Sequence, residues 1–323
     1  MKVRARTDAS LAARVVSRRP LFYARGADAS LDRPAHVRAG SALARIGEGR
    51  LAIVQDDASF LAVVDLASGT AFDVPFPAAD GVRLFDDSRG NKKRKLDLEA
   101  MIALPDGTVI AFGSGSSDVR DRVLVARGED VRLVRAEELY AAMRADRTFS
   151  GSELNVEGSA LDGGDVVFFQ RGNGAGDAID ATARVEARAL LRHLHGDGPC
   201  PVLRDVVAWD LGTATDGVRL TFTDGATTSQ GLAFLACAEA CPDATRDGPV
   251  SGVSIGRLDD RARACAVAEV TDERGAPLVD KAEGLAVAPD GARAWVVIDK
   301  DDPSVPSELL ELALGDGWRT PIA

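Results

Sequence analysis

The sequence predicts an all-β fold, a five-bladed β-propeller, with six blades as the alternative count. Two observations lead to this prediction. A unit made of an acidic residue, a small residue, a short apolar stretch, a glycine turn and a second apolar run recurs along the 323 residues. A single hairpin of this kind cannot bury its apolar face, whereas repeated sheets packed around an axis can.

The repeat is clearest in three segments and weaker in two. The clear copies read EAMIALPDGTVIAFGS at 99–114, EGSALDGGDVVFFQR at 157–171 and EGLAVAPDGARAWVVID at 283–299. The weaker copies read SALARIGEGRLAIVQDD at 41–57 and DGATTSQGLAFLACAE at 224–239. Their second runs are rich in β-branched and aromatic residues, which is typical of strands.

The first position of each unit sets the spacing of the repeat. It is occupied by Ser41, Glu99, Glu157, Asp224 and Glu283, at separations of 58, 58, 67 and 59 residues. Gln230 is an alternative for the fourth unit, but no turn and second strand follow it at the right distance. We therefore expect residues 1–323 to form one propeller domain, with units starting near 41, 99, 157, 224 and 283.

The segments outside the repeat have predictions of their own. Only 40 residues precede Ser41, too few for another unit, so we expect AARVVSRRPLFYARG at 12–26 to supply an outer strand to the last blade. Joining the first and last segments in one sheet protects a sheet edge. The spacing of apolar residues predicts short helices at 135–145 and 187–196.

Composition and charge exclude several classes of protein. Hydrophobic residues make up 46% and charged residues 28%, with 39 Lys and Arg against 50 Asp and Glu, a net charge of −11. This mixture is typical of a globular protein. The acidic balance argues against a nucleic-acid partner, which needs a basic face on the protein. No run approaches the roughly 18 apolar residues of a membrane span, so we also expect no membrane partner.

The N-terminal sequence indicates a cytoplasmic protein. Arg14, Arg18 and Arg19 interrupt the apolar stretch that a signal peptide requires after its basic start. The four cysteines are Cys200, Cys237, Cys241 and Cys265. They lack the spacing of a zinc site, and in a reducing cytosol we expect free thiols.

The acidic positions have a chemical meaning in a propeller. The first strand of each blade lines the central channel, so Glu99, Glu157, Asp224 and Glu283 are expected to converge with Ser41 in a ring. Four carboxylates so close cannot all stay ionised unless a cation or basic side chains neutralise them. Ca²⁺ is a hard cation that accepts about six to eight oxygen ligands, which suits such a ring.

Two other interpretations of the acidic positions stay open. Their carboxylates can accept hydrogen bonds from backbone N–H groups of neighbouring blades and hold the ring together. They can also pair with basic residues that are close in sequence, namely Lys95, Arg171, Lys281 and Lys300. Ion-pair networks of this kind perturb carboxylates without any ligand.

Polar residues follow the second strand of each unit. The third unit has the richest set, which consists of Asn155, Glu157, Arg171 and Asn173. The Arg171 guanidinium can clamp a carboxylate or phosphate of a ligand, or it can pair with Glu157. The sequence leaves open whether these strand ends lie beside the ring or at the other end of the channel.

Two short motifs are excluded as catalytic sites. GVSIG at 252–256 matches the GxSxG pattern of serine hydrolases, but all three histidines precede Ser254 and the segment has the pattern of a strand. His193 and His195 lie in a helix end or loop and lack a third metal ligand.

The recurring EGLA with a later DG turn resembles the calcium-dependent propeller hydrolases, which include the gluconolactonase/regucalcin, paraoxonase and esterase-like phytase groups. This resemblance implies a divalent cation in the channel, held by Glu, Asn and Asp of several blades. The segments LNVEG (154–158), FFQRGN (168–173) and DGPVSGVSIG (247–256) resemble an uncharacterised bacterial propeller family. The characterised hydrolases have six blades, and their Asn ligands have no match here except Asn155.

These observations lead to one functional hypothesis and one alternative. The hypothesis is a metal-dependent hydrolase of a small ester, lactone or phosphoester, whose divalent cation, Ca²⁺ before others, is held by Glu99, Glu157, Asp224 and Glu283 with Asn155. The expected catalytic residues are Glu157, Arg171 and Asn173. A ring carboxylate acts as general base, while Arg171, Asn173 and Lys300 orient the substrate. The alternative is a non-catalytic propeller that binds a ligand or a protein and has a structural acidic ring.

Overall fold

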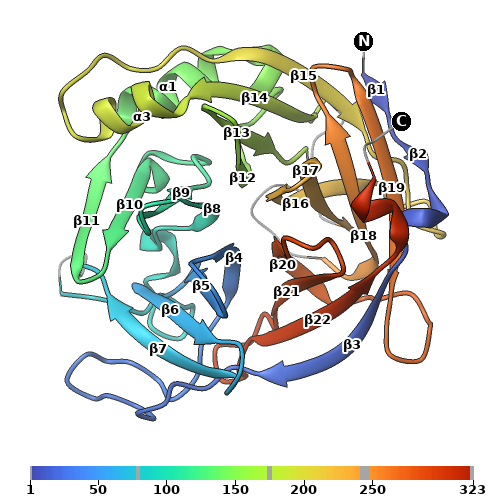
Figure 1. Ribbon diagram of the computed structural model, residues 1–323. Coiled ribbons are helices and arrows are strands. Elements are labelled where there is room, and N and C mark those ends of the chain that lie inside the picture. Colours follow the sequence, from blue (N-terminus) through green and yellow to red (C-terminus); the bar gives the residue numbers. More distant parts are fainter. Residues whose placement is uncertain (1, 78–80, 173–176, 241–247, 321–323) are drawn as a thin grey trace.

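The computed structural model describes residues 2–77, 81–172, 177–240 and 248–320. Its strands lie around a central axis (Figure 1), and the innermost ones are β4 (Gly40–Arg45), β8 (Leu98–Ala103), β12 (Val156–Asp162), β16 (Leu220–Thr228) and β20 (Lys281–Val287). Each innermost strand contacts the next, and β20 contacts β4, which closes the circle. The predicted all-β propeller class is confirmed.

The first two sheets each contain four antiparallel strands. One consists of β4, β5 (Arg50–Gln55), β6 (Phe60–Asp65) and β7 (Thr70–Pro75). The next consists of β8, β9 (Val109–Gly113), β10 (Arg122–Arg127) and β11 (Asp130–Arg135). Apolar side chains of both sheets form one buried cluster between them, in which Val54 and Leu61 meet Met101 and Leu124. The core is thus a set of layers between neighbouring sheets.

The third sheet contains β12, β13 (Asp165–Gln170), β14 (Asp180–Glu186) and β15 (Arg204–Asp210), and the short strand β1 (Val3–Arg4) pairs in parallel with β15 at its edge. The rings of Phe112 and Phe168 meet edge to face between the second and third sheets, with centroids 4.9 Å apart. This geometry is a favourable one for aromatic pairs.

The largest sheet contains two antiparallel runs of four strands. The first run is β16, β17 (Gly231–Glu239), β18 (Val250–Asp259) and β19 (Ala264–Thr271), with the short strand β2 (Arg6–Thr7) paired to β19. The second run is β20, β21 (Arg293–Asp299), β22 (Glu308–Leu314) and β3 (Ala13–Pro20). A short parallel pairing of β3 with β19 joins the runs. Strand pairing therefore gives four sheets, and the predicted count of five blades is not confirmed by it.

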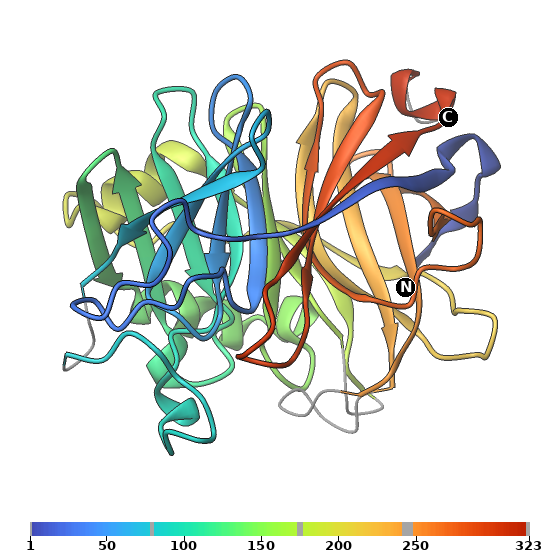
Figure 2. The ribbon, with the colours of Figure 1, turned by 90° about the horizontal axis from the view of Figure 1, so that it is seen from below.

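The N-terminal strand β3 pairs with β22 in an antiparallel register that places Ala13 opposite Leu314. Figure 2 shows β3, in dark blue, running across the side of the molecule to reach this place. The pairing agrees with the outer strand expected within residues 12–26. It covers the outer edge that β22 would otherwise expose to solvent.

The helices are few and short. The α-helices are α1 (Glu137–Ala145), α2 (Arg147–Ser150) and α3 (Ala187–Leu194), and the 3₁₀ turns are η1 (Ala9–Leu11), η2 (Lys92–Arg94), η3 (Asp118–Arg120) and η4 (Asp316–Arg319). Helices α1 and α3 lie within the predicted ranges. Leu139, Tyr140 and Met143 form the buried side of α1. In the described ranges, every helix is too short or too polar to span a membrane.

Candidate functional site

Each innermost strand contains a β-bulge near its start. In β8 the register passes from Leu98 opposite Gly113 to Ala100 opposite Phe112, so Glu99 has no partner across the strand pair. The same shift leaves out Ser41 in β4, Glu157 in β12 and Glu283 in β20. A bulge releases a side chain from the regular alternation of the strand. These four residues line one cavity on the axis.

The residue after each bulge is small because the innermost strands approach one another there. A Cβ atom on Gly158 would lie 2.5 Å from the backbone of β16, and one on Gly284 would lie 2.9 Å from the backbone of β4. Ala42 and Ala100 hold the corresponding places in β4 and β8. The acidic-then-small motif of the sequence therefore marks a bulge followed by a close approach of strands.

The fourth innermost strand departs from the prediction. The bulge of β16 lies between Phe222 and Asp224, so Thr223 holds the ring position and Asp224 holds the place of the small residue. The Asp224 carboxylate is buried and accepts backbone N–H groups from Gly225 and from Leu285 in β20, both at 2.7 Å. The expectation that Asp224 belongs to the acidic ring is wrong, because it joins innermost strands behind the ring.

The axial cavity has a volume of about 630 Å³, which is suitable for a small molecule. Paired strands are antiparallel, so the start of each innermost strand lies beside the end of its second strand. Lys281, for example, is opposite Asp299. The strand ends therefore line the same cavity as the ring, and they contribute Asp56, Arg171, Glu239 and Asp299. Carboxylates outnumber basic side chains two to one in the cavity lining.

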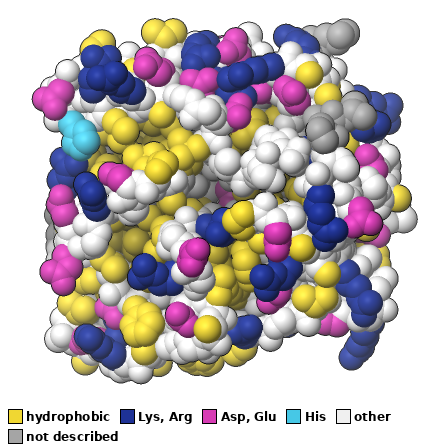
Figure 3. All heavy atoms as spheres, viewed as in Figure 1, with side chains coloured by type: hydrophobic (Ala, Val, Ile, Leu, Met, Phe, Trp, Pro, Cys, Tyr) yellow, Lys and Arg dark blue, Asp and Glu magenta, His cyan; other side chains and the backbone are white. Residues whose placement is uncertain are grey.

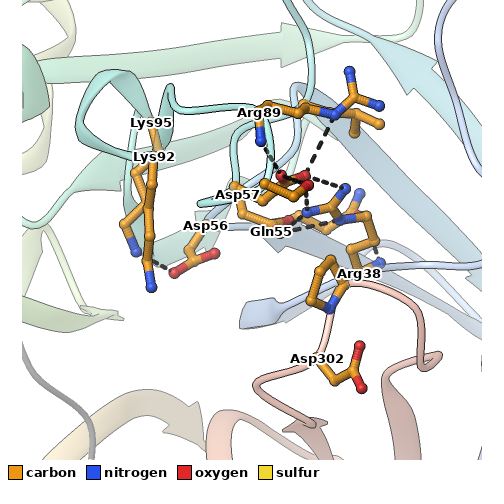
Figure 4. Close-up of polar contacts among 12 residues, drawn as sticks. Arg38, Gln55, Asp56, Asp57, Arg89, Lys92, Lys95 and Asp302 are labelled. Carbon is orange, nitrogen blue, oxygen red and sulfur yellow. Dashed lines mark hydrogen bonds and ion pairs between the residues drawn. The ribbon is translucent and has the colours of Figure 1, made fainter.

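Three carboxylates form a group between the first and second sheets. One oxygen from each of Asp56, Asp97 and Glu99 lies within 4.8 Å of the others, a spacing that a single bound cation can bridge. The Lys95 ammonium forms an ion pair with Asp56 (Figure 4). It forms a second one with Asp97, at 2.7 Å. Arg120 binds the other oxygen of Asp97 at 2.9 Å. Within the described ranges, the Glu99 carboxylate forms no hydrogen bond or ion pair.

Both oxygens of Glu157 have partners. Oε1 accepts a hydrogen bond from the Asn155 amide at 2.6 Å, and Oε2 lies 3.5 Å from the Arg171 guanidinium. Arg171 also binds Glu239 at 2.5 Å and donates to the Thr221 hydroxyl at 3.2 Å. Arg171 therefore ties the third sheet to β16 and β17 and fixes the orientation of Glu157.

Only one of the two carboxylate oxygens of Glu283 has a charged partner among the described residues. Its Oε1 lies 3.7 Å from the Lys281 ammonium, whereas its Oε2 is buried and has no hydrogen-bond partner among the residues described. Lys281 also pairs with Asp299 at 3.5 Å and with Asp301 at 2.6 Å. A buried polar atom without a partner costs on the order of 1–3 kcal/mol. A cation bound at this oxygen would remove that cost.

Burial raises the pKa of the three ring glutamates. The pKa of Glu99 rises well above its usual range because the carboxyl is buried and the negative charges of Asp97 and Glu157 lie close to it. Burial likewise raises the pKa of Glu283 well above its usual range, although Lys281 opposes the shift. The pKa of Glu157 is also raised by burial. The ring therefore favours protonated carboxyls when no further cation is present.

Asp97 behaves in the opposite way. Burial alone would raise its pKa, but the charges of Lys95 and Arg120 outweigh burial and hold the pKa below its usual range. Asp97 is thus an ionised carboxylate two residues before Glu99, whose pKa is raised. Neighbouring carboxyls with divergent pKa values are typical of functional sites, although structural ion pairs also produce them.

A second charged group lies along the outer wall of the cavity. Arg38 is buried and pairs with Asp57 and, at 3.3 Å, with Asp86 (Figure 4). Burial and the neighbouring Asp56 raise the pKa of Asp57 to about 7, against the opposing charge of Arg38. Burial also raises the pKa of Asp299 to about 6. Both carboxyls therefore titrate between pH 5 and pH 8.

The opposite end of the channel is apolar. A recess of about 370 Å³ lies there, with Leu43, Met101, Leu161 and Leu285 in its lining. Hydrophobic side chains gather near the centre of this face (Figure 3), on which the turns between first and second strands lie (Figure 2). Asp224 lies between the acidic ring and this recess, since the next residues of β16 line the recess.

A model of a protein family of unknown function, DUF6929, matches residues 36–314. The chain belongs to this family. The match begins just before β4 and ends at the last residue of β22, so it contains every residue that lines the axial cavity. Strand β3 lies outside it. A search of the curated proteins finds no match.

Several solved propeller structures are similar to the DUF6929 chain. The PQQ-bound aldose sugar dehydrogenase of Streptomyces coelicolor has a TM-score of 0.44 at 12% identity, covering 96% of this chain and 100% of that one. The glutaminyl cyclase of Myxococcus xanthus has a TM-score of 0.45 at 12% identity, covering 98% and 100%. A luciferin-regenerating enzyme has a TM-score of 0.41 at 10% identity, covering 87% and 94%. Similarity of this degree says nothing about the reaction.

The predicted site residues thus fall into four groups. Glu99, Glu157, Glu283 and Asn155 line the cavity together with Arg171. Asp224 lies behind it. Asn173 lies outside the described residues. Lys300, expected to orient substrate, pairs instead with Asp280 and Glu308 and is not among the cavity-lining residues.

The sequence-based prediction missed two residues, one at the bulge of β16 and one in the cavity lining. At the bulge, Thr223 follows the apolar Phe222, as Glu99, Glu157 and Glu283 follow Leu98, Val156 and Ala282, and this pattern would have identified it. Asp97 stands two residues before Glu99, as Asn155 stands two residues before Glu157. The repeat therefore carries a second polar position that the search for acidic residues passed over.

The residues present fit a hard divalent cation. The available donors are carboxylate and amide oxygens, which Ca²⁺ and Mg²⁺ prefer, and the described part of the cavity lining contains no histidine or cysteine. Among the residues that the structure describes, the buried Oε2 of Glu283 has no hydrogen-bond partner and can serve as a ligand atom. The Glu99 carboxylate, which has no hydrogen bond or ion pair within the same residues, offers a second ligand.

Proposed function

We propose that the axial cavity binds a divalent cation, Ca²⁺ before others, and that the protein is a metal-dependent hydrolase of a small ester, lactone or phosphoester. The observation that carries the proposal is the state of two ring glutamates. Glu99 has no hydrogen bond or ion pair within the described residues, and the buried Oε2 of Glu283 has no hydrogen-bond partner there. A purely structural ring would satisfy both carboxylates from within the protein.

The cation ligands in this proposal are Asp56, Asp97 and Glu99 as a group, and Glu283 and Asn155 line the same cavity. Asp224 is not among them, because its oxygens accept backbone N–H groups. The proposal treats the five antiparallel runs of four strands as five blades. A bound divalent cation would polarise a carbonyl or phosphoryl oxygen as a Lewis acid.

The protein's own residues supply the remaining functions. A ring carboxyl that does not bind the cation, such as Glu157, whose pKa is raised by burial, can exchange a proton with the substrate or with water as a general acid–base group. Arg171 is bound to Glu157 and Glu239, so its role is to position Glu157 rather than to hold substrate. The Lys92 and Lys93 side chains line the cavity from its exposed loop and can attract an anionic group of the substrate.

The first test is thermal unfolding of chelator-treated protein with and without millimolar Ca²⁺, Mg²⁺ or Mn²⁺. A ligand that binds only the folded state adds about 2.7 kcal/mol of stability at 100 times its Kd. We expect a rise in Tm for the wild type and a much smaller rise for Glu99→Gln. The matched control is Glu137→Gln on α1, an exposed carboxylate outside the cavity, which should keep the full rise.

The second test is a screen of small lactones, carboxylic esters and phosphoesters with cation-loaded protein. Hydrolysis of one class that Glu99→Gln reduces at least tenfold, and that Glu137→Gln leaves unchanged, supports the proposal. If no cation changes the Tm of the wild type, the metal-dependent reaction is excluded. If a cation raises the Tm but none of these substrates is hydrolysed, the hydrolase assignment fails and the cation site remains.

The second candidate is a non-catalytic binding propeller. It is favoured by the protein's own basic side chains, which already pair with carboxylates that line the cavity. These side chains are Lys95, Arg120, Arg171 and Lys281. This candidate predicts that a small organic ligand, and no divalent cation, raises the Tm of the wild type.

A further inference from the structure

The side chain of Lys95 lies where a cation bound by Asp56, Asp97 and Glu99 would lie. Its ammonium pairs with Asp56 Oδ2 and with Asp97 Oδ1, the latter at 2.7 Å. Both carboxylates belong to the group whose oxygens lie within 4.8 Å of one another. A divalent ion that took these oxygens as ligands would lie close to the ammonium, and the repulsion between the two positive charges favours displacement of the ammonium.

We propose that Lys95 is an exchangeable internal counter-ion of this site, which a divalent cation must displace in order to bind. This inference rests on the cation site of the proposed function, and it adds that Lys95 regulates metal binding at that site. Lys95 neutralises the carboxylates when no metal is bound and competes with the metal when one arrives. The apparent affinity for the metal then equals the intrinsic affinity of the carboxylates multiplied by the fraction of molecules in which Lys95 has left them.

The charge of the group favours such an exchange. Three carboxylates face two basic side chains, Lys95 and Arg120, so one negative charge is left over when all of them are ionised. Replacing the single charge of Lys95 by a divalent cation makes the group neutral. Arg120 can remain, because it binds the other oxygen of Asp97 and the Ser116 hydroxyl.

A second observation points to a cation in the same cavity. Glu283 Oε2 is buried without a hydrogen-bond partner among the described residues, and the Glu283 side chain lines the cavity with the Asp56, Asp97 and Glu99 group. Lys281 lies 3.7 Å from the other oxygen of Glu283, a distance beyond a hydrogen bond. Among the described residues, this oxygen therefore has no hydrogen-bond donor, and a cation bound in the cavity would satisfy it.

The position of Lys95 in the chain allows its side chain to leave. It follows the 3₁₀ turn η2, in which Lys92, Lys93 and Arg94 are exposed, and it precedes the buried Leu96. The backbone N–H of Lys95 donates to Lys92 O at 3.1 Å, a contact that is independent of the side chain. Release of the ammonium therefore requires rotation of the side chain only, and the hydrogen bond of this turn can stay in place.

The first experiment is calorimetric titration of chelator-treated protein with Ca²⁺, with Mg²⁺ and Mn²⁺ in parallel. The variant is Lys95→Met, which keeps the aliphatic stem and removes the charge. We expect its Kd to be at least tenfold lower than that of the wild type. The matched control is Lys93→Met, a cavity-lining lysine of the same loop with no ion pair in the described structure, whose Kd should stay within about twofold of the wild type.

Lys95→Arg provides a second variant, because it retains the positive charge. Its Kd should equal or exceed that of the wild type. A Lys95→Met protein that binds with unchanged or weaker affinity overturns the inference, and so does a Lys95→Arg protein that binds more tightly. If neither the wild type nor Lys95→Met binds any of the three cations, the cation site itself fails. If Lys95→Met binds a cation tightly and the wild type binds none, the result supports competition between Lys95 and the cation.

A second readout follows displacement in the wild type. Acetylation of lysines by an amine-reactive ester, measured by mass spectrometry, reports the exposure of each ammonium. Added Ca²⁺ should increase the labelling rate of Lys95 several-fold and leave that of Lys93 unchanged. Ca²⁺ binding without a change at Lys95 would show that the ammonium stays in place, which overturns the inference while leaving the proposed function intact.

Discussion

The two ends of the channel differ in chemistry although the same strands form both. At the start of the innermost strands, bulged residues and strand ends surround a cavity rich in carboxylates. A few residues further along the same strands, Leu43, Met101 and Leu285 surround an apolar recess. Glu99 and Met101 are two residues apart in β8 and belong to opposite ends. The apolar end follows from packing alone, whereas the buried carboxylates need a separate explanation.

The largest expected effect concerns the apolar end. Met101 is 2% exposed and packs in the core between the first two sheets. Met101→Ala removes buried methylene groups and leaves a cavity, so it should lower the free energy of unfolding by about 3 kcal/mol. Urea unfolding measures this change. The Kd for Ca²⁺ should stay within about twofold, and a tenfold loss of affinity would contradict the separation of the two ends.

The next effect concerns the boundary between the ends. Asp224→Ala leaves the N–H groups of Gly225 and Leu285 without their acceptor, so the free energy of unfolding should fall by about 2 kcal/mol. Asp224→Asn keeps one acceptor oxygen but turns an amide NH2 toward the N–H group that the other oxygen accepted. It should therefore recover only part of the stability that Asp224→Ala loses. Equal losses for both variants would show that the charge of Asp224 is required.

A smaller effect distinguishes the acidic end by its pH dependence. Asp57 and Asp299 have native pKa values of about 7 and about 6, raised chiefly by burial, and Glu99 is also raised. The native state therefore holds protons between about pH 4.5 and pH 7 that the unfolded state has lost, so stability falls as pH rises through this range. Each unit of pKa difference corresponds to about 1.4 kcal/mol.

The measurement is the free energy of unfolding in urea at half-unit steps from pH 4.5 to pH 8, in the presence of a chelator. We expect a decrease of at least about 1 kcal/mol across the range. Saturating Ca²⁺ should flatten the profile, because a bound cation favours the ionised carboxylates. A profile that is flat without a cation, or that rises with pH, would contradict the raised pKa values.

The comparison also shows what the sequence could reveal. The acidic-then-small motif identified Glu99, Glu157 and Glu283 because a bulge and a close approach of strands impose that pattern in each unit. The motif failed at Asp224, where an acidic residue fills the place of the small one. The two-residue motif alone cannot distinguish Asp224 from the ring glutamates, since in both an acidic residue precedes a small one.

The ion-pair partners of the carboxylates could not be predicted from the sequence, for a different reason. Lys95 and Arg120 reach Asp97 from two separate loops, and Arg171 reaches Glu239 across the boundary between sheets. Such contacts depend on how neighbouring sheets are set against one another, which local patterns do not encode. The sequence named Lys95, Arg171 and Lys281 as possible partners, but it also named Lys300, which lies elsewhere.

The pairing of β3 with β22 has a consequence for the order of folding. Ala13 lies opposite Leu314 in this pairing, so β3 can pair with β22 only after the much later residues of β22 have been synthesised. Until then, the buried side chains Ala13 and Val15 lack the neighbours that cover them. A chain halted before residue 308 would therefore carry an open ring and an exposed strand edge, both of which favour association with other chains.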